Sequence, residues 1–385
     1  MAFADEQNAI YLNGVQGRRP RRPIDWRDLE HQVSNQLQPG PWGYIAGSAG
    51  RESTTDANRD ALDRVKIVPR MLRDVSERRL ARNILGTDFS APVFLSPIGV
   101  QTLAHPDGEL ASARAAASMG VPFTASTASS HTLEQIAHAA GAAPRWYQLY
   151  WPKSRDLAAS FIARAEASGY SALVVTLDTW LLAWRPRDLT EAFLPFLWAE
   201  GNVNYFSDPV FCSMLDVPPQ DDPRAAVELF TSEFSNASVT WDDLRWLRDR
   251  TSLPIILKGI QHVDDARCAV DAGMDAVFVS NHGGRQVDGA IGSLDALASI
   301  GEAVGSQIEL LFDSGVRGGA DVVKALSLGA SAVGLGRPFV WGLAAGGEAG
   351  VRDVVAHLLA EVELTMALSG IADVADLDRS VLDFS

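Results

Sequence analysis

The sequence predicts an α/β protein that folds as a closed (β/α)8 TIM barrel with an N-terminal helical extension. From about residue 91 onward, short apolar β-branched runs alternate with segments of helical periodicity, the pattern of a parallel sheet covered by helices. The unit occurs eight times, which favours a closed barrel over an open doubly wound sheet. No Gly-x-Gly-x-x-Gly motif follows the first strand, and this disfavours a dinucleotide-binding fold.

The repeating units define the expected strands and helices in chain order. We expect strands at residues 93–96, 122–125, 145–150, 172–176, 255–258, 276–279, 309–312 and 332–334. The helices are expected at residues 109–119, 133–139, 154–167, 241–250, 264–272, 294–303, 320–328 and 351–368. Two helix starts carry the pattern of a capping box, Thr132 with Gln135 and Thr240 with Asp243.

The whole chain, 1–385, is expected to form one domain, with the barrel at residues 91–370. Residues 1–90 are expected to form one or two helices plus extended segments that pack under and over the barrel, and residues 371–385 a tail. The connection after the fourth strand is far longer than the roughly 2–6 residues of an ordinary βα loop. Its residues 180–239 are rich in aromatic residues and proline, which predicts a packed lid; an oligomer contact is the alternative.

Composition restricts the partners and the compartment. The chain has 33 basic and 48 acidic residues, a net charge of −15, which disfavours nucleic acids and anionic membranes as partners. Its two cysteines form no disulfide framework or CxxC metal pattern, so we expect a cytoplasmic protein without a metal site. We find no signal peptide and no membrane-spanning window. The basic run at residues 18–22 is interpreted as a solvated arm before the first helix.

Polar residues and glycines follow nearly every predicted strand. Reactive groups of barrels lie at the carboxyl ends of the strands, so these positions are the candidates for chemistry. In strand order they are Pro97, Ile98 and Gly99, then Ser126, then Gln148 and Tyr150, then Thr176, Asp178 and Arg185, then Lys258, then Ser280, His282 and Arg285, then Asp313, Ser314, Gly315 and Arg317, and finally Gly336 and Arg337.

The ends of the seventh and eighth strands predict a phosphate site. Glycines such as Gly315 and Gly336 let backbone N–H groups approach an anion, and Arg317 and Arg337 supply positive charge. This is the common phosphate position in barrels. Each glycine alone could equally serve a tight turn, and the combination with both arginines favours phosphate.

The loop after the sixth strand predicts proton transfer on an acidic substrate. His282 titrates near neutrality and can accept a hydroxyl proton. Arg285, three residues later, offers a two-pronged donor for a carboxylate. Asp178 could orient the histidine and stabilise its charge, the alternative being a plain capping or loop residue.

Lys258 at the end of the fifth strand allows two chemical interpretations. Its amine could form a Schiff base with a carbonyl compound, or its charge could face the anionic edge of a reduced flavin. The second interpretation agrees better with the phosphate site and the proposed base. A lysine in a structural ion pair is a further alternative.

Several motifs together resemble the FMN-dependent L-2-hydroxy-acid oxidase and dehydrogenase family. They are Ser-Asn-His-Gly-Gly-Arg-Gln at 280–286, Asp-Ser-Gly-Val-Arg at 313–317, Gly-Arg-Pro at 336–338, Pro-Ile-Ile-Leu-Lys-Gly at 254–259 and Ala-His-Pro-Asp-Gly-Glu at 104–109. The resemblance covers about residues 30–370, and the motifs agree in order.

The resemblance implies an FMN cofactor and a role for each candidate. FMN would contact Pro97, Ile98, Gly99, Ser126, Gln148, Thr176, Lys258, Ser280, Asp313, Ser314, Gly315, Arg317, Gly336 and Arg337. The substrate carboxylate would meet Tyr44, Arg185 and Arg285; Tyr150 would bond near the reacting hydroxyl, and His282, beside Asp178, would take its proton. Without the resemblance, Tyr44 reads as a core residue and Arg185 as a surface arginine. The family forms tetramers or larger assemblies, which implies a homo-oligomer.

Two features are similar to the lactate 2-monooxygenases within this family. One is the long fourth connection, and the other is Gly99, where many lactate-oxidising relatives have alanine. A glycine would leave room beside the reactive edge of the flavin, although a tight turn is the alternative explanation.

The expected activity is therefore the FMN-dependent oxidation of L-lactate, or a similar small L-2-hydroxy acid, with O2. His282 would take the hydroxyl proton as the Cα hydrogen passes to FMN as hydride, with a carbanion route left open. Oxidative decarboxylation to acetate, CO2 and water is the leading expectation. The alternative is an oxidase that releases the 2-keto acid and H2O2, and more distant ones are a Schiff-base lyase and a non-catalytic binder of a phosphate ligand.

Overall fold

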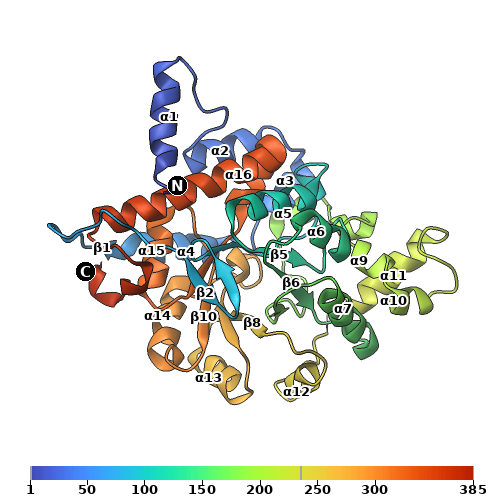
Figure 1. Ribbon diagram of the computed structural model, residues 1–385. Helices are drawn as coiled ribbons and strands as arrows, with labels where there is room; N and C mark the ends of the chain where they lie inside the picture. The colour runs from blue at the N-terminus through green and yellow to red at the C-terminus, as the bar shows by residue number, and fades with distance from the viewer. Residues whose placement is uncertain (1, 235, 385) are drawn as a thin grey trace.

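The computed structural model describes residues 2–234 and 236–384, and its centre is a closed barrel of eight parallel strands (Figure 1). The order around the barrel is β10-β11-β4-β5-β6-β7-β8-β9, so strands that follow one another in the chain are neighbours. They are β4 (Val93–Leu95), β5 (Phe123–Ser126), β6 (Arg145–Tyr150), β7 (Leu173–Thr176), β8 (Ile255–Ile260), β9 (Ala276–Val279), β10 (Glu309–Phe312) and β11 (Ala332–Leu335). The predicted fold class is confirmed.

Helices surround the barrel in the predicted order. They are α5 (Gly108–Met119), α6 (Leu133–Ala140), α7 (Arg155–Ala167), α12 (Asp243–Arg248), α13 (Val263–Asp271), α14 (Ser293–Val304), α15 (Gly319–Ser327) and α16 (Arg337–Leu368). The largest difference is in α16, which begins directly after β11 and not at residue 351. Non-helical backbone at Gly346 and Gly347 interrupts it, and this glycine pair hides the helical periodicity of its first part.

One of the two predicted capping boxes is confirmed. The Thr132 hydroxyl accepts from the Gln135 N–H at 3.2 Å, and the Gln135 side chain accepts from the Thr132 N–H at 3.0 Å. At the start of α12 the Asp243 carboxylate accepts from the Thr240 N–H at 2.8 Å, but the Thr240 hydroxyl donates to the same carboxylate at 3.2 Å. The second box is therefore incomplete, because the hydroxyl binds the charged oxygen and accepts no backbone N–H.

A small hairpin fills the amino end of the barrel. Strands β2 (Arg82–Ile84) and β3 (Thr87–Phe89) pair antiparallel. Phe89 packs on Trp146 with ring centroids 5.6 Å apart, and Trp146 packs on Phe94 at 5.2 Å. Burial of these rings makes the lower barrel apolar, so the polar groups of the barrel are concentrated toward its carboxyl end.

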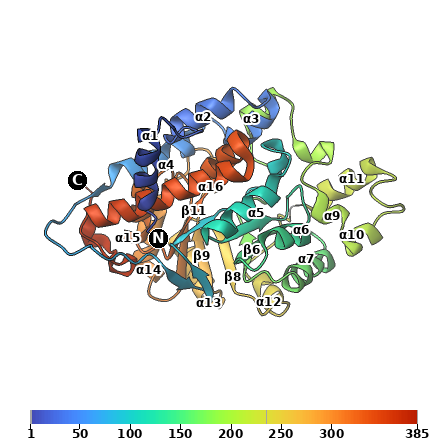
Figure 2. The ribbon, with the colours of Figure 1, turned by 45° about the horizontal axis from the view of Figure 1, so that its top comes forward.

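The described part of the N-terminal extension contains four helices, where one or two were predicted. They are α1 (Asp5–Val15), α2 (Trp26–Ser34), α3 (Pro39–Ala46) and α4 (Ser53–Arg64). Helix α1 has no buried residue, so it lacks the apolar stripe from which a helix is predicted. Helix α2 runs beside α16 (Figure 2), where Leu29 and Val33 pack on Trp341.

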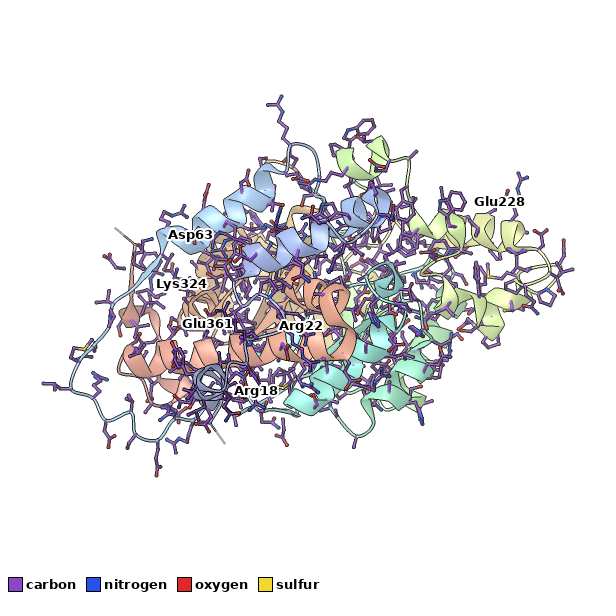
Figure 3. All side chains as sticks on the ribbon, turned by 90° about the horizontal axis from the view of Figure 1, so that it is seen from above. Arg18, Arg22, Asp63, Glu228, Lys324 and Glu361 are labelled. Carbon is purple, nitrogen blue, oxygen red and sulfur yellow. The ribbon has the colours of Figure 1, made fainter. Side chains whose placement is uncertain are left out.

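The basic run at residues 18–22 lies between α1 and α2, and the interpretation as an arm before the first helix was wrong. Arg22, which Figure 3 labels beside α16, donates through Nε and Nη2 to the carboxylate of Asp353 at 3.0 and 2.6 Å. The run is therefore solvated only in part, and Arg22 ties the segment before α2 to α16.

The long fourth connection is an ordered helical insertion. Apart from residue 235, which lies outside the described residues, positions 180–239 contain α8 (Pro186–Thr190), η2 (Pro195–Trp198), α9 (Val203–Phe206), α10 (Pro209–Ser213) and α11 (Pro223–Glu233). Tyr205 is buried, and its ring lies 4.9 Å from Phe161 of α7 and 4.8 Å from Phe230 of α11. These aromatic contacts fix the insertion to the side of the barrel.

The end of the chain pairs with the extension. Strand β12 (Leu382–Asp383) lies antiparallel to β1 (Lys66–Ile67), after the short helices η4 (Val374–Asp376) and η5 (Arg379–Val381). Among residues 2–234 and 236–384, no helix combines the length and apolar character that a membrane crossing requires.

Candidate active site

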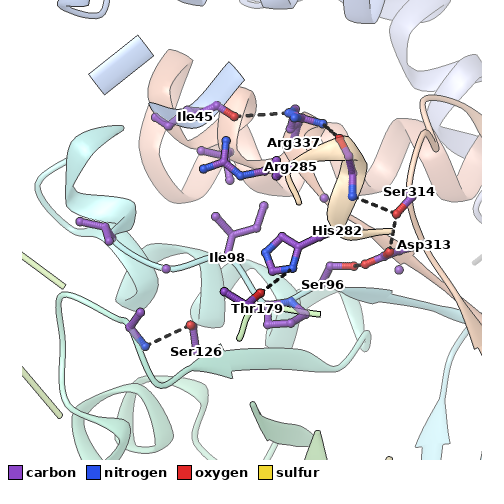
Figure 4. A pocket seen from close by; sticks show the side chains of 18 of the residues that line it. Ile45, Ser96, Ile98, Ser126, Thr179, His282, Arg285, Asp313, Ser314 and Arg337 are labelled. Atoms are coloured by element: carbon purple, nitrogen blue, oxygen red, sulfur yellow. Dashed lines mark hydrogen bonds between the residues drawn. The ribbon is translucent and has the colours of Figure 1, made fainter. Parts of the chain in front are cut away.

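A cavity opens at the carboxyl ends of the strands and gathers most of the predicted site residues (Figure 4). Its predicted lining residues are Tyr44, Pro97, Ile98, Gly99, Ser126, Tyr150, Arg185, Lys258, His282, Arg285, Asp313, Ser314, Gly315, Arg317, Gly336 and Arg337. They come from α3, from the insertion and from the ends of most strands. One continuous cavity therefore joins the predicted phosphate end to the predicted base.

Four predicted residues do not line this cavity but lie behind its wall. Gln148 donates to the Thr176 hydroxyl at 2.9 Å and accepts from the Ser126 hydroxyl at 2.9 Å, so it connects three neighbouring strands. The four residues are Gln148, Thr176, Ser280 and Asp178, none of which lines the cavity. In this structure all four support other side chains of the site.

His282 and Asp178 form a hydrogen-bonded pair at the cavity wall. The distance from His282 Nδ1 to Asp178 Oδ1 is 2.9 Å, and the Thr179 hydroxyl donates to the same oxygen at 2.9 Å. Figure 4 shows Thr179 directly below the imidazole. An ionised carboxylate only accepts, so Nδ1 carries the proton and Nε2 carries the lone pair. This hydrogen bond fits the predicted orienting role of Asp178 better than a plain capping role.

The charge state of the pair suits a base. Burial opposes ionisation of Asp178, but His282, its hydrogen bond and Lys258 together hold the pKa of Asp178 below its usual range. Burial lowers the pKa of His282 below 6.5, although Asp178 opposes this shift. At neutral pH the pair is therefore a carboxylate beside a neutral imidazole, and Asp178 is placed to stabilise the imidazolium after proton uptake.

The loop that carries His282 has an uncommon backbone. In η3 (His282–Gly284), His282 has φ 59° and the two following glycines have φ 66° and 80°. Asn281 holds this loop to α4, since it exchanges two hydrogen bonds with Asn58, at 2.9 and 2.6 Å. Sequence reasoning missed Asn58 and Thr179, which carry no motif of their own; the sole signal for Thr179 was its position next to Asp178.

Two arginines, the buried Arg185 and the half-buried Arg285, lie next to one another in the cavity wall. Arg185 donates through Nε to the carbonyl of Arg285 at 3.0 Å and through Nη2 to Gln286 at 2.7 Å. Arg285 donates through Nη1 to the carbonyls of Tyr44 and Gly47 at 2.6 and 2.7 Å. Arg185 is 6% exposed, so the alternative that it is a surface arginine was wrong. Tyr44 lines the cavity, so the alternative that it is a core residue was also wrong.

The electrostatics of this wall favour an anion. Burial, followed by the charge of Arg285, lowers the pKa of Arg185 to about 10. The nearest acid, Asp188, lies 4.0 Å from Arg185. A pair of guanidinium groups with so little compensation attracts a carboxylate.

Lys258 is held as a donor at the bottom of the cavity. Its Nζ donates to the Ser280 hydroxyl at 2.9 Å and lies 3.8 Å from Asp313. Ser280 and Ser96 donate in turn to the two oxygens of Asp313, at 2.6 and 2.9 Å. An amine engaged in this network supplies a fixed cation, which favours the flavin interpretation over the Schiff-base one.

The two arginines of the predicted phosphate end differ in their surroundings. Arg337 makes four hydrogen bonds: it donates to the carbonyls of Ile45, Gly47 and Gly283 and to the Ser48 hydroxyl. Arg317 donates through Nη1 only to the carbonyl of its own neighbour Val316, and its buried Nε has no partner among the described residues. Burial lowers its pKa to about 10. A half-buried cation that forms no ion pair among the described residues, next to Gly315 with its φ of 91°, fits a bound phosphate.

Gly99 lines the cavity and also lies against a neighbouring loop. A Cβ at this position would lie 2.3 Å from the Ala128 carbonyl oxygen. The missing side chain therefore permits close contact with that backbone, and room beside the reactive edge of the flavin stays a prediction.

Comparisons with known proteins agree with this chemistry. The family described as FMN-dependent dehydrogenase matches residues 33–384. The chain is 44% identical to an FMN-dependent alpha-hydroxy acid dehydrogenase, qulF, of Penicillium citrinum, over 99% of this chain and 96% of that protein. It is 43% identical to an L-lactate oxidase of Lysinibacillus sphaericus, over 92% and 91% of the two chains. A structure of mandelate oxidase with (S)-4-hydroxymandelic acid is 39% identical, with a TM-score of 0.83 over 94% and 98% of the chains. The chain therefore belongs to the FMN-dependent 2-hydroxy acid dehydrogenase and oxidase family, and it is an FMN-dependent oxidoreductase of these acids.

Proposed function

We propose that this enzyme is an oxidase that converts an L-2-hydroxy acid and O2 into the 2-keto acid and H2O2. The observation that carries the proposal is the placement of the His282–Asp178 pair beside Arg185 and Arg285 in one cavity. The pair suits proton removal from a hydroxyl, and the arginines suit the adjacent carboxylate. Relatives described as lactate oxidase and mandelate oxidase support O2 as the electron acceptor.

The residues present suit FMN as the cofactor. Arg317 and the turn at Gly315 would hold its phosphate, and Lys258 would place a cation near its ring. When bound, FMN would supply a two-electron acceptor for the Cα hydrogen and a donor of those electrons to O2. The protein supplies the remaining steps.

His282 receives the hydroxyl proton at Nε2, while Asp178 keeps the ring in position through Nδ1. Burial raises the pKa of Tyr150, so its phenol stays protonated and can donate to the reacting oxygen. The substrate thus loses its hydroxyl proton and its Cα hydrogen, and O2 gains two electrons and two protons as H2O2.

The substrate side chain meets an aromatic wall, which supports an apolar group at that position. The rings of Tyr150 and Phe234 are 5.0 Å apart, those of Phe196 and Phe234 are 5.5 Å apart, and those of Tyr44 and Phe196 are 6.3 Å apart. We name these four residues the aromatic wall. Its edges suit an aryl or alkyl substituent, and the mandelate oxidase relative supports the aryl case.

The products formed in air test the proposal. Holoenzyme is supplied with L-lactate and, separately, with (S)-mandelate, and O2 uptake, keto acid, H2O2 and CO2 are measured. We expect one keto acid and one H2O2 for each O2 consumed. Consumption of O2 with release of CO2 and the shortened acid would contradict the oxidase proposal and identify a monooxygenase. Turnover with a dye but not with O2 would identify a dehydrogenase.

Lactate 2-monooxygenase remains the second candidate, because the insertion forms part of the cavity. Phe196 of η2 and Phe234 after α11 both line it, so the insertion has the position of a lid. A lid that opens slowly would keep the keto acid in contact with newly formed peroxide. The outcome then depends on whether product release precedes the reaction with O2.

Replacing Phe234 with alanine should change the preference among substrates. Loss of the ring removes contact with a bulky side chain but little contact with a methyl group, so kcat/KM for mandelate should fall by about 10- to 100-fold relative to lactate. The ratio of the two kcat/KM values is measured. Trp198→Ala, which removes a 70% exposed ring outside the cavity, is the control. An unchanged ratio would show that the aromatic wall does not contact the substrate side chain.

The activity should decline in acid. Because His282 must be unprotonated and its pKa lies below 6.5, kcat/KM should be constant above that pH and fall by about tenfold per pH unit below the lowered pKa. The kcat/KM–pH profile is measured with lactate. A decline already complete above pH 6.5 would contradict the position assigned to this histidine.

We also propose that the protein forms a homo-oligomer. Exposed large apolar side chains are concentrated on one stretch of the chain: Leu181, Leu182, Trp184, Leu189, Leu197 and Trp198. Such patches usually mark protein contacts. Sedimentation equilibrium should give a multiple of 41.4 kDa, and a 41.4 kDa species at micromolar concentration would contradict the proposal.

A further inference from the structure

Two tryptophans from distant parts of the chain surround the unpaired cation of the cofactor site. The Arg317 guanidinium carbon lies 5.4 Å from the ring centroid of Trp26 and 5.0 Å from that of Trp341. The two indoles are stacked, with centroids 6.3 Å apart and an interplanar angle of 15°. Trp341 belongs to α16 and is fully buried, whereas Trp26 is the first residue of α2, outside the barrel.

Arg317 has few other contacts to fix its direction. Its side chain makes one hydrogen bond, to the adjacent carbonyl, and no ion pair of it is present among the described residues. The charges of Glu30 and Asp321 act on Arg317, but neither acid forms an ion pair with it. Asp321 accepts instead from Arg59 at 2.7 Å and from the Arg317 backbone N–H at 2.8 Å. The faces of the two indoles are therefore the main surface against which the guanidinium can be oriented.

Trp26 also covers part of Arg317 on the side of a surface groove. A groove between α1, α2, α15 and α16 is lined by Trp26 and Arg59, and Arg317 lines both this groove and the active-site cavity. Without the indole, more of the guanidinium would contact water in the groove. Water contact would weaken the attraction of Arg317 for an anion, because the local dielectric constant would rise.

The position of Trp26 is itself fixed by contacts with α16. Arg22 is joined to Asp353 by two hydrogen bonds, and Leu29 packs on Trp341. Asp25 caps α2, since its side chain accepts from the Arg27 N–H at 2.7 Å. The N-terminal segment thus arrives at the phosphate end of the cavity with a defined geometry.

We propose that Trp26 is a positioning residue for the FMN phosphate, acting through Arg317. The N-terminal segment from Arg22 to Trp26 is then part of the cofactor site, although it contributes no group that touches FMN. The proposal rests on FMN binding by this family and is independent of which product the enzyme releases, because its test measures cofactor affinity.

The test compares FMN with riboflavin, which has the same ring and ribityl chain but no phosphate. Apoprotein of the full chain is titrated with each flavin, and quenching of flavin fluorescence gives the Kd. We expect Trp26→Ala and Trp26→Leu each to weaken FMN binding by about tenfold, with riboflavin binding changed by less than about twofold. Trp26→Phe, which keeps an aromatic face, should restore most of the affinity for FMN.

Tyr11→Ala is the matched control, since Tyr11 lines the same groove without touching Arg317. It should leave both affinities unchanged. Circular dichroism melting of each apoprotein checks the fold; if Trp26→Ala does not fold, Trp26→Leu and Trp26→Phe carry the comparison. Unchanged FMN affinity in Trp26→Leu, or equal losses for FMN and riboflavin, would overturn the proposal.

Discussion

Replacing His282 with asparagine should slow reduction of the bound flavin by a 2-hydroxy acid by about 10²- to 10⁴-fold, the usual contribution of a general base. Asparagine has no group that can take up the hydroxyl proton, but its size and polarity keep the loop filled. The rate is measured as bleaching of the flavin absorbance in anaerobic stopped flow. FMN should stay bound, because the phosphate end of the cavity is formed by other residues.

His357→Asn is the matched control for this substitution. His357 lies on α16, 3.9 Å from Glu6, and belongs to the groove under α1 instead of the active-site cavity. Its removal should leave the reduction rate unchanged. A His282→Asn enzyme that is still reduced within a factor of ten of the native rate would remove the base role from His282.

The second large effect is expected from Asp178→Asn. The amide keeps the shape of the carboxylate but can donate to Nδ1 of His282, which moves the ring proton to Nε2 and removes the lone pair that faces the cavity. It also removes the charge that stabilises the imidazolium. A loss of about 10²- to 10⁴-fold in the reduction rate is expected by analogy with orienting carboxylates in other enzymes.

The same variant has a second readout. The charge of Asp178 raises the pKa of His282 against the effect of burial, so the acid limb of any residual activity should move to lower pH. Thr179→Val, which removes one hydrogen bond to Asp178 and leaves its charge, should cost no more than about tenfold. If Asp178→Asn and Thr179→Val have equal effects, the carboxylate charge is not what the reaction needs.

The barrel could be predicted because its strands are short, apolar and regularly spaced, and this pattern depends on neighbouring residues alone. The extension could not. Helix α1 buries nothing, and α3 begins with Pro39 and contains two glycines, so neither shows amphipathic periodicity. The first half of α16 was missed for a related reason, the glycine pair at 346 and 347.

The site residues also differ in whether the neighbouring sequence marks them. His282, Arg285 and Lys258 could be predicted because they lie at or just after the carboxyl ends of strands, where barrel chemistry occurs. Asn58 and Trp26 could not, because their partners are distant in the chain: Asn281 for the first and Arg317 for the second. Even where the residue was predicted, its partners were not, since Arg337 binds backbone carbonyls that no sequence pattern marks.

The left-handed backbone at His282 limits which residues could ever stand in its place. A φ of 59° is costly for most side chains and is best tolerated by glycine, asparagine and aspartate. Alanine or glutamine at this position would combine loss of the base with strain in the loop, whereas asparagine separates the two effects. During divergence, a change of base at this position would need a second change in the loop 281–284, so we expect the reaction chemistry to change far more slowly than the aromatic wall, which we propose contacts the substrate side chain.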